Sequence, residues 1–288
     1  MKILVIGGTR YFGKRLVHML IKEGHEIWVM SRGKTEDDFG ARVHRLKADR
    51  SKKEEMLSVL GSLKFDAVVD QVCMDAQQAA LAVEVFTERT SYYIMTSTMS
   101  VYDWGPRIKE EDCNPFLYQP RQASNPAEQY GENKRAAEAT FANQNAFAWA
   151  FARFPVVLGE DDYTERLLGQ IRRVQEGTPI YYPNLHARFS FISSEDAARA
   201  LLWLLHGKHE GAYNFASPDS WQLAELVENI EKVTGKKAQL QQKPSDEAWS
   251  PFGIPSDWYM DVSKAADDGY KAKPLAEWLP SLIATLAK

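Results

Sequence analysis

A tyrosine and a lysine four positions apart form the first pair of side chains in this sequence that could move a proton. Tyr130 and Lys134 follow Pro126 in a segment with alanines at helical spacing, so both should lie on one face of a helix, one turn apart. A phenol with its usual pKa of ~10 is a weak acid and base near neutral pH, and a nearby ammonium favours its ionised form. The pair could therefore act in general acid–base catalysis. The alternative is an exposed pair without a chemical role.

A glycine-rich turn near the N-terminus is the second candidate. Lys2 to Ile6 is a short apolar run, typical of a strand buried on both faces, and helical spacing follows the turn. Gly7 permits a tight turn, Gly8 lets a pyrophosphate approach the backbone, and Gly13 lets the helix pack on the strand. The N-terminus of that helix offers N–H groups and a positive dipole to an anion. We interpret the turn as a dinucleotide-binding loop; a plain strand-to-helix connection is the alternative.

Strands and helices alternate through the first half of the chain, and this alternation must position both candidates. The expected strands cover 2–6, 25–30, 43–46, 65–69 and 91–96, and helices are expected over 52–60 and 75–88. Such alternation predicts a parallel sheet with right-handed crossovers, whose ligands bind beyond the carboxyl ends of the strands. The predicted fold class is α/β, a Rossmann-type doubly wound parallel sheet.

The end of the second expected strand indicates which dinucleotide binds. Folds that bind NAD usually place Asp or Glu here to accept a hydrogen bond from the ribose 2′-hydroxyl, whereas this chain has Ser31 and Arg32 and no carboxylate before Glu36. An arginine would instead pair with a 2′-phosphate, and Arg10 in the glycine turn would add a second positive charge. We predict NADP and keep NAD as the alternative; two solvated arginines would give the same sequence.

Three segments resemble the extended and atypical short-chain dehydrogenases/reductases, an NAD-dependent epimerase/dehydratase-like family. The glycine turn resembles its Gly-Gly-Thr-Arg-x-x-Gly subgroup, a strand end resembles its catalytic Ser/Thr motif, and the tyrosine–lysine pair resembles its Tyr-x-x-x-Lys motif. These segments cover residues 5–13, 95–102 and 130–134.

The resemblance implies roles for single residues. Thr98 would hold the substrate oxygen beside the Tyr130 phenol, with Ser97 as the alternative hydroxyl, and Lys134 would also bind the nicotinamide ribose. Asp49 matches the position that contacts the adenine. The expected catalytic residues are Thr98, Tyr130 and Lys134. The expected cofactor-binding residues are Gly7, Gly8, Thr9, Arg10, Tyr11, Phe12, Gly13, Ser31, Arg32, Asp49, Lys134 and Pro155. No metal is expected.

The resemblance covers nearly the whole chain and implies two domains. Later segments at 151–159, 190–198, 213–216 and 264–274 resemble the sixth strand and the elements that follow it. The dinucleotide-binding core is expected to comprise 1–159 and 186–210. A small α+β domain that binds substrate is expected to comprise 160–185 and 211–288.

The chain departs from the family pattern at positions that select the substrate. Met99 and Ser100 follow the catalytic threonine, where sugar-nucleotide dehydratases have Asp-Glu, so elimination is disfavoured. Val156 stands where the epimerases have an asparagine that contacts the substrate. Arg188 is displaced by one residue from the position of their phosphate-binding arginine, which on a strand reverses the face. A UDP- or dTDP-sugar is therefore not the favoured substrate.

The leading hypothesis is an NAD(P)-dependent oxidoreductase or epimerase that transfers hydride at a hydroxyl or carbonyl carbon of a small molecule, with tyrosine as acid/base. Reduction and epimerisation both stay open. The alternative is an NADP(H)-binding sensor or RNA-binding protein without turnover, because the glycine subgroup also resembles chloroplast stem-loop RNA-binding proteins. With 35 Lys and Arg against 39 Asp and Glu, net charge −4, the chain has no basic excess, which favours the enzyme over a nucleic-acid binder.

Composition excludes several other classes. The 288 residues are 44% hydrophobic and 26% charged, which argues against disorder and coiled coil, and no apolar run reaches the ~18 residues of a membrane helix. Two cysteines without metal-type spacing fit a reducing cytoplasm. We expect a cytoplasmic protein without a membrane partner and leave a homodimer open. His206 and His209 are assigned to a helix end, where cations suit the dipole, rather than to a metal site.

Overall fold

The protein is described here by a computed structural model that covers residues 1–245 and 247–288. The chain divides into two compact units. The first unit comprises residues 1–102, 110–154 and 197–214, and the second comprises 103–109, 155–196 and 215–288. No helix of the described residues is long and apolar enough to cross a membrane.

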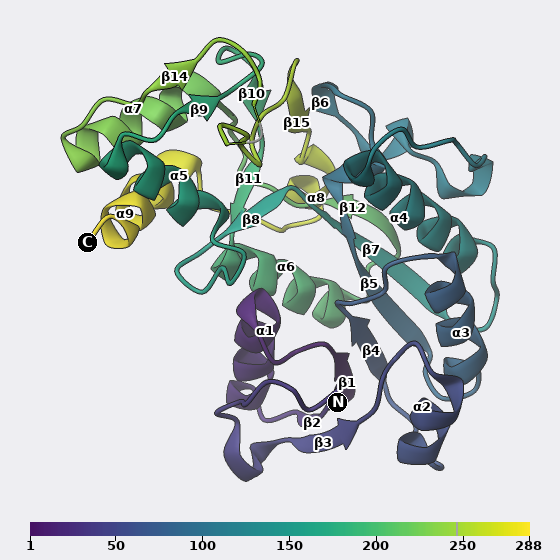
Figure 1. Cartoon of the computed structure of the whole chain (residues 1–288). Coiled ribbons are helices and arrows are strands. Elements are labelled where there is room, and N and C mark those ends of the chain that lie inside the picture. Colours follow the sequence, from purple (N-terminus) through teal and green to yellow (C-terminus); the bar gives the residue numbers. More distant parts are fainter. Residues whose placement is uncertain (246) are drawn as a thin grey trace. The chain divides into compact units, whose positions relative to one another are not determined.

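A seven-stranded sheet, parallel throughout, forms the centre of the first unit (Figure 1). In spatial order its strands are β12 (Gly211–Asn214), β7 (Ala148–Phe154), β5 (Tyr92–Thr98), β4 (Ala67–Asp70), β1 (Lys2–Ile6), β2 (Glu26–Ser31) and β3 (His44–Lys47). The central strands are buried along almost their whole length, because helices cover both faces of the sheet. The predicted fold class, an α/β doubly wound sheet, is confirmed.

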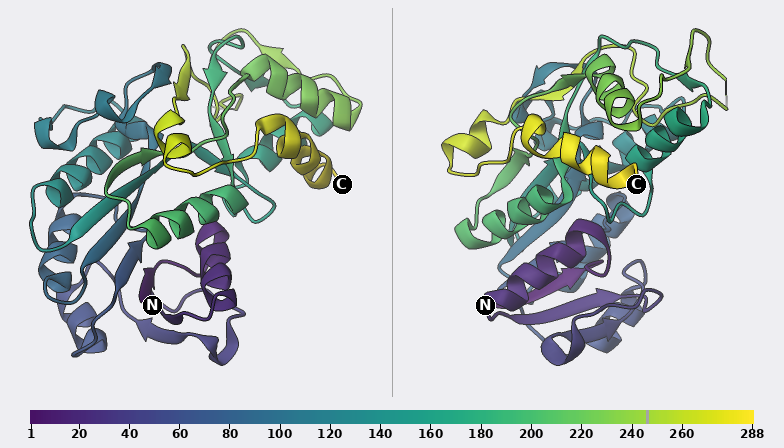
Figure 2. Two further views of the ribbon diagram at one scale, coloured as in Figure 1. Left: turned by 180° about the vertical axis from the view of Figure 1, so that it is seen from behind. Right: turned by 90° about the vertical axis from the view of Figure 1, so that its left-hand side faces the viewer.

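Five helices cover this sheet. They are α1 (Tyr11–Lys22), α2 (Lys53–Leu60), α3 (Ala76–Phe86), α4 (Pro126–Ala142) and α6 (Ser194–Gly207). α3 and α4 pack together on one face, while α1 and α6 lie on the other (Figures 1 and 2). Beneath α3 and α4, the ring of Tyr93 lies 4.9 Å from that of Phe141 and 5.3 Å from that of Phe147. These aromatic contacts pack α4 on the sheet. α4 is the helix that carries the tyrosine–lysine pair.

The second unit consists of short strands and four helices. Its four-stranded sheet has the order β13 (Trp221–Gln222), β10 (Arg188–Phe189), β15 (Trp258–Met260) and β6 (Gly105–Ile108). The strand pairs are β8 (Val156–Leu158) with β11 (Phe191–Ser193) and β9 (Ile180–Tyr181) with β14 (Leu240–Gln241). The helices are α5 (Arg166–Glu176), α7 (Leu223–Thr234), α8 (Ser263–Asp267) and α9 (Leu275–Leu286). α5, α7 and α9 pack on one another.

Several segments lie in a different unit from the one that the sequence predicted. β12 pairs with β7, with Tyr213 opposite Ala152, so residues 211–214 belong to the large sheet and not to the smaller unit. Residues 155–159 and 186–196 fall in the second unit, where β8 pairs with β11. Both differences arise from strand pairings between segments far apart in the chain, which local periodicity does not encode.

Candidate functional site

The glycine turn after β1 leaves no room for side chains. Gly7 has φ +85°, and a Cβ there would lie 2.7 Å from a methyl carbon of Val72. A Cβ at Gly8 would lie 2.7 Å from a Val5 methyl carbon and 2.9 Å from a Val17 methyl carbon. The backbone is therefore held directly at the ends of the strands, as a loop that receives a pyrophosphate requires.

The start of α1 is equally close to the sheet. A Cβ at Gly13 would lie 2.2 Å from the side-chain oxygen of Gln71, just beyond β4. Tyr11, the first residue of the helix, has φ +53°, which a residue other than glycine seldom adopts. The Nε of Arg10 donates to the Thr35 hydroxyl at 2.9 Å, so this guanidinium reaches the loop that follows β2. The helix N-terminus and a cation thus lie together beyond β1 and β2.

A cavity of about 660 Å³ lies beyond the ends of β2 and β3. The charged side chains that line it are Arg32, Lys34, Lys47, Asp49, Lys52, Glu54 and Glu55. Lys52 and Glu55 pair with each other at 2.9 Å. Arg32, Lys34 and Lys47 are exposed, and their charges make this rim suited to a phosphate group.

Asp49 is fixed as an ionised carboxylate at this rim. A hydrogen bond from the Ser51 hydroxyl (2.7 Å) is the main cause that lowers the pKa of Asp49, and the Ser51 N–H (3.0 Å) and the charge of Arg32 act in the same direction. Its own backbone N–H donates to Glu55 at 2.9 Å. Asp49 and Arg32 therefore line one cavity, and their contacts to the adenosine half of the cofactor stay predictions.

Three contacts hold α4 against the end of β5. A Cβ at Gly131 would lie 2.3 Å from the carbonyl oxygen of Ser100, so only glycine allows this approach. The Nζ of Lys134 donates to the carbonyls of Cys73 (2.6 Å) and Thr96 (2.9 Å). One residue further, the Arg135 guanidinium donates to the Val101 carbonyl at 2.9 Å. The helix that carries Tyr130 is thereby fixed beside the strand end that carries Thr98.

The two candidate hydroxyls at this strand end differ in their surroundings. Ser97 is buried, and its hydroxyl donates to a carboxylate oxygen of Glu138 at 2.6 Å. Thr98 is partly exposed and accepts from the N–H of Ser100 at 3.1 Å, which starts the short helix η2 (Met99–Val101). Thr98 is therefore the better placed hydroxyl of the two.

Tyr130 and Lys134 share a helix but not an environment. The side chain of Lys134 is almost fully buried, at 2% exposure, whereas Tyr130 is 37% exposed. An ammonium group has three N–H donors, and the two carbonyls use two of those of Lys134. Lys134 can thus hold the backbone of two strand ends and donate once more to a ligand.

A buried polar network supports this strand end from behind. Arg153 on β7 is fully buried and forms an ion pair with Glu138 on α4. It also donates to the Tyr102 hydroxyl (2.7 Å) and to the carbonyls of Glu110 (3.0 Å) and Cys113 (2.8 Å). Burial disfavours the charged guanidinium, but the Glu138 carboxylate outweighs this and raises the pKa of Arg153. α4, β5 and β7 are thereby locked to one another.

A second buried ion pair lies at the end of β4. Asp70 is fully buried, pairs with Arg50 and accepts from the Tyr93 hydroxyl at 2.7 Å. Arg50 directly follows Asp49, so this pair anchors the loop that carries one of the carboxylates of the cavity. Burial also raises the pKa of the nearby Cys73 thiol to about 12, which disfavours the thiolate form.

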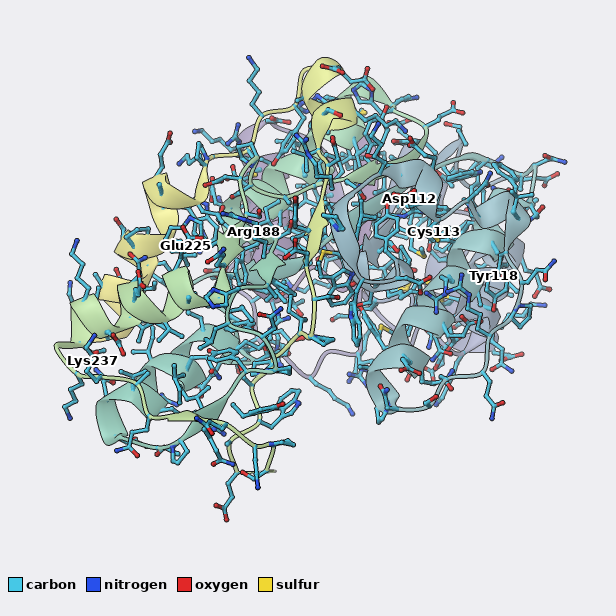
Figure 3. All side chains as sticks on the ribbon, turned by 90° about the horizontal axis from the view of Figure 1, so that it is seen from above. Asp112, Cys113, Tyr118, Arg188, Glu225 and Lys237 are labelled. Atoms are coloured by element: carbon cyan, nitrogen blue, oxygen red, sulfur yellow. The ribbon has the colours of Figure 1, made fainter. Side chains whose placement is uncertain are left out.

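In the second unit, the arginine that the sequence singled out has partners of its own. The guanidinium of Arg188 donates to the Ser220 carbonyl at 2.6 Å and lies 3.9 Å from a carboxylate oxygen of Glu225. Figure 3 labels Arg188 and Glu225. Tyr182 is buried and donates to the Gln170 side chain at 3.0 Å. Pro155, expected at the cofactor, is the residue between β7 and β8. Its role stays a prediction.

Sequence reasoning missed the residues that hold the site together. These are Gly131, Glu138, Arg153, Arg50 and Asp70. One signal was present, because Arg153 interrupts an otherwise apolar strand, and a charge in such a strand needs a buried partner. Another was Asp70, at the end of the fully buried β4. The partner residues carry no comparable signal, because nothing local distinguishes them from solvated charges.

The model of the NAD-dependent epimerase/dehydratase family matches residues 3–216, well over half of the chain. The chain belongs to this family. The membership agrees with the glycine turn, the sheet order and the tyrosine–lysine helix described above, and it confirms the family that the three sequence segments indicated.

Two curated proteins are similar to the chain. The chloroplast stem-loop binding protein of 41 kDa b of Arabidopsis thaliana is 27% identical over 221 residues, which is 71% of this chain and 55% of that protein. The chain therefore spans about half the length of this relative. The 2′-dehydrokanamycin reductase of Streptomyces kanamyceticus is 23% identical over 281 residues, 93% of this chain and 73% of that protein.

Solved structures confirm the fold over the whole chain. A Thermus thermophilus UDP-glucose 4-epimerase in complex with NAD has a TM-score of 0.78 at 18% identity and covers 100% of this chain and 98% of its own. A Bacillus anthracis dTDP-glucose 4,6-dehydratase in complex with NAD has a TM-score of 0.77 at 17% identity, with coverages of 98% and 95%. The family match supports a nicotinamide dinucleotide as cofactor and an enzyme over a protein without turnover.

Proposed function

We propose that this protein is an NADP-dependent oxidoreductase or epimerase that transfers hydride at a hydroxyl or carbonyl carbon of a small substrate, with Tyr130 as acid/base. The observation that carries the proposal is the fixation of α4 on the end of β5, through Gly131 against Ser100 and Lys134 on two carbonyls. Tyr130 lies on α4 and Thr98 at the end of β5. Because α4 is fixed against this strand end, the phenol and the hydroxyl can contact the same substrate oxygen.

The glycine turn and the start of α1 fit a dinucleotide. Gly7, Gly8 and Gly13 keep the backbone free of side chains, and the helix N-terminus favours a pyrophosphate. When bound, a nicotinamide cofactor supplies or accepts the hydride. For reduction, Tyr130 donates its phenolic proton to the substrate oxygen while the Thr98 hydroxyl holds that oxygen. Lys134 donates its third N–H to the ribose and stabilises the phenolate that remains, which solvent then reprotonates.

The charges beyond β2 favour NADP over NAD. Arg32, Lys34 and Lys47 stand at the cavity, and Arg10 reaches the same loop through Thr35. Three carboxylates also line this cavity, but one oxygen of Asp49 receives two hydrogen bonds from Ser51, and Glu55 is paired with Lys52. A 2′-phosphate would find arginine and lysine donors here, whereas a 2′-hydroxyl would find no dedicated carboxylate.

For the substrate we favour a carbonyl or hydroxyl on a sugar-like ring without an attached nucleotide. Met99, in the place of a dehydratase carboxylate, is buried at 2% exposure, and Arg188 is engaged by Ser220. The relative that matches nearly the whole chain is named as a reductase of 2′-dehydrokanamycin, a name that fits carbonyl reduction on an aminosugar.

The decisive experiment compares Tyr130→Phe with native protein on a panel of keto-sugars and keto-aminosugars with NADPH. We expect turnover to fall by ~10²–10⁴ because the proton donor is lost, while NADPH affinity stays near native. Net consumption of NADPH identifies a reductase, and interconversion of epimers without net consumption identifies an epimerase. Native turnover in Tyr130→Phe would refute the assignment.

Tyr118→Phe is the matched control. The Tyr118 phenol donates a hydrogen bond at 2.6 Å to Glu132, which lies on α4 with Tyr130. This variant therefore tests whether the loss of another phenol near α4 also lowers activity. We expect this variant to keep native turnover. Binding of stem-loop RNA that persists at ~200 mM salt, without turnover of any carbonyl or hydroxyl compound, would favour the binding function instead.

A further inference from the structure

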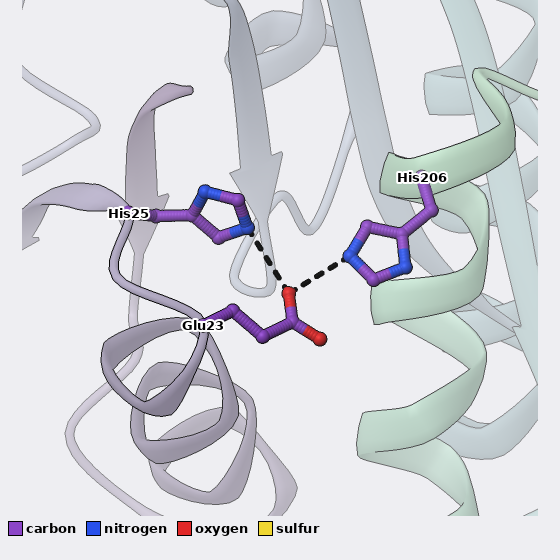
Figure 4. A group of neighbouring side chains, drawn as sticks. All are labelled: Glu23, His25 and His206. Atoms are coloured by element: carbon purple, nitrogen blue, oxygen red, sulfur yellow. Dashed lines mark hydrogen bonds and ion pairs between the residues drawn. The ribbon is translucent and has the colours of Figure 1, made fainter.

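We propose that Glu23, His25 and His206 form a binding site for a divalent transition-metal ion such as Zn²⁺ or Ni²⁺. Their ligand atoms all lie within 4.8 Å of one another. One oxygen of Glu23 lies 3.0 Å from the Nε2 of His25 and 2.8 Å from the Nε2 of His206 (Figure 4). The site is independent of the proposed activity and of the tyrosine–lysine helix.

The end of α1 places the first two ligands. The backbone N–H of Gly24 bonds to the Ile21 carbonyl (3.1 Å) and that of His25 to the Leu20 carbonyl (3.2 Å), which is the Schellman pattern that ends a helix. Gly24, at φ +75°, makes this turn possible. Glu23 and His25 therefore flank one rigid residue, with both side chains directed to the same point (Figure 4).

The last turn of α6 supplies the third ligand. His206 projects from α6 toward Glu23, and its ring lies 6.4 Å from that of His25 at an angle of 61° (Figure 4). The two rings are thus splayed and not stacked, so both nitrogens can face a common ion. The Nδ1 of His25 lies 3.2 Å from the Met1 ammonium, which can only donate, so the ring proton is on Nε2 and faces Glu23. Binding of an ion at Nε2 would release that proton, and Nδ1 would then take a proton from the ammonium.

The ligand set selects the kind of ion. Two imidazoles and one carboxylate are the donors that Zn²⁺ and its neighbours prefer, whereas Ca²⁺ and Mg²⁺ require mostly oxygen. Tetrahedral Zn²⁺ with bonds of about 2.0–2.1 Å separates its ligand atoms by roughly 3.3 Å, so the hydrogen-bonded pairs need to open by only a few tenths of an ångström. The Glu23 and His206 side chains are 34% and 47% exposed, so water can complete the shell.

The position of the site indicates its role. It lies at the end of α1 opposite to the glycine turn, and a helix of 12 residues is about 18 Å long. An ion there would join α1 to α6 on one face of the sheet and would stabilise the fold without touching the reacting atoms.

The test is titration of the full chain, without an affinity tag and stripped with a chelator, with Zn²⁺, Ni²⁺ and Co²⁺ in a calorimeter. We expect one ion per chain with a Kd in the micromolar range or below, a rise in the melting temperature, and a visible absorption band for bound Co²⁺. Mg²⁺ should give none of these. His206→Ala should weaken the affinity roughly tenfold or more.

Two further variants keep the outcome interpretable. His206→Gln retains a side chain that can donate to Glu23 but removes the ring nitrogen, so it should fold normally and still lose the ion. His209→Ala is the matched control, because this ring stacks on Trp203 at 3.7 Å and lies outside the cluster; its affinity should be native. The proposal is overturned if no ion binds saturably, or if His206→Gln binds as tightly as native protein. In that event the cluster consists of hydrogen bonds alone.

Discussion

At the end of β5 the polar side chains are buried and bonded to one another, whereas at the ends of β2 and β3 they are exposed around a cavity. Arg153, Glu138 and Lys134 are at most 2% exposed and reach α4, β5 and β7. Arg32 and Lys47, which line the cavity at the ends of β2 and β3, are exposed. The buried side chains at the end of β5 must therefore contribute to folding in addition to the chemistry proposed above, while the exposed ones at the cavity can be altered at little cost in stability.

Removal of the buried carboxylate should have the largest effect. Glu138→Gln leaves the Arg153 guanidinium buried without its counter-ion, and we expect the free energy of unfolding to fall by about 3–5 kcal/mol in urea denaturation. The double variant Glu138→Leu with Arg153→Met should recover most of this loss. If the free energy of unfolding of Glu138→Gln fell by less than about 1 kcal/mol, the buried side chains at the end of β5 would contribute no more to stability than the exposed ones at the cavity.

A methyl group between α4 and η2 should have an intermediate effect. Gly131→Ala would put its Cβ 2.3 Å from the Ser100 carbonyl oxygen, so the helix must move. We expect stability to fall by about 1–3 kcal/mol and turnover by up to about 100-fold. Gly169→Ala is the matched control, because nothing lies within 4 Å of its Cβ inside α5, and it should gain about 0.5–1 kcal/mol. Native turnover in Gly131→Ala would show that the close contact does not position Tyr130.

The smallest effect is expected at the exposed rim. Arg32→Ala should lower NADPH affinity by about tenfold and leave NADH affinity unchanged, because a charge-assisted hydrogen bond to a phosphate is lost. Stability should change by less than about 0.5 kcal/mol. Calorimetry with both cofactors measures the difference, and Lys53→Ala, whose side chain pairs with Glu84 outside the cavity, is the control. Equal affinity of native protein for NADPH and NADH would overturn the choice of NADP.

The sequence predicted those parts of the fold that local patterns encode. The apolar run of β1, the glycine turn and the helical spacing of α1 follow directly along the chain. The structure has β1 at the expected residues 2–6, and a helix follows the glycine turn as expected. The placement of β12 was wrong, because a short edge strand has the same local pattern whether it pairs with β7 or with the smaller unit. The pairing of β6 with β15 was not predicted for the same reason.

In the candidate site, too, local patterns were predicted and contacts between distant segments were not. The types and spacing of Tyr130 and Lys134 predicted a shared helix, but not that one side chain is buried and the other exposed. Nor did they predict the close approach of Gly131 to Ser100, because Ser100 lies on another element. The four partners of Arg153 are Tyr102, Glu110, Cys113 and Glu138, which lie between 15 and 51 residues before it, so no short window of sequence contains them together.

The two carbonyl contacts of Lys134 bear on how such motifs are interpreted. Because its ammonium joins the loop after β4 to β5, selection for folding alone would retain a lysine at this position. Tyr130 is exposed on the same helix and does not join these two strand ends. In a descendant that had ceased to turn over substrate, the lysine would persist while the tyrosine drifted. Under the role proposed for Tyr130, the residue at position 130 is therefore a more informative mark of turnover than the lysine in chains that share this contact.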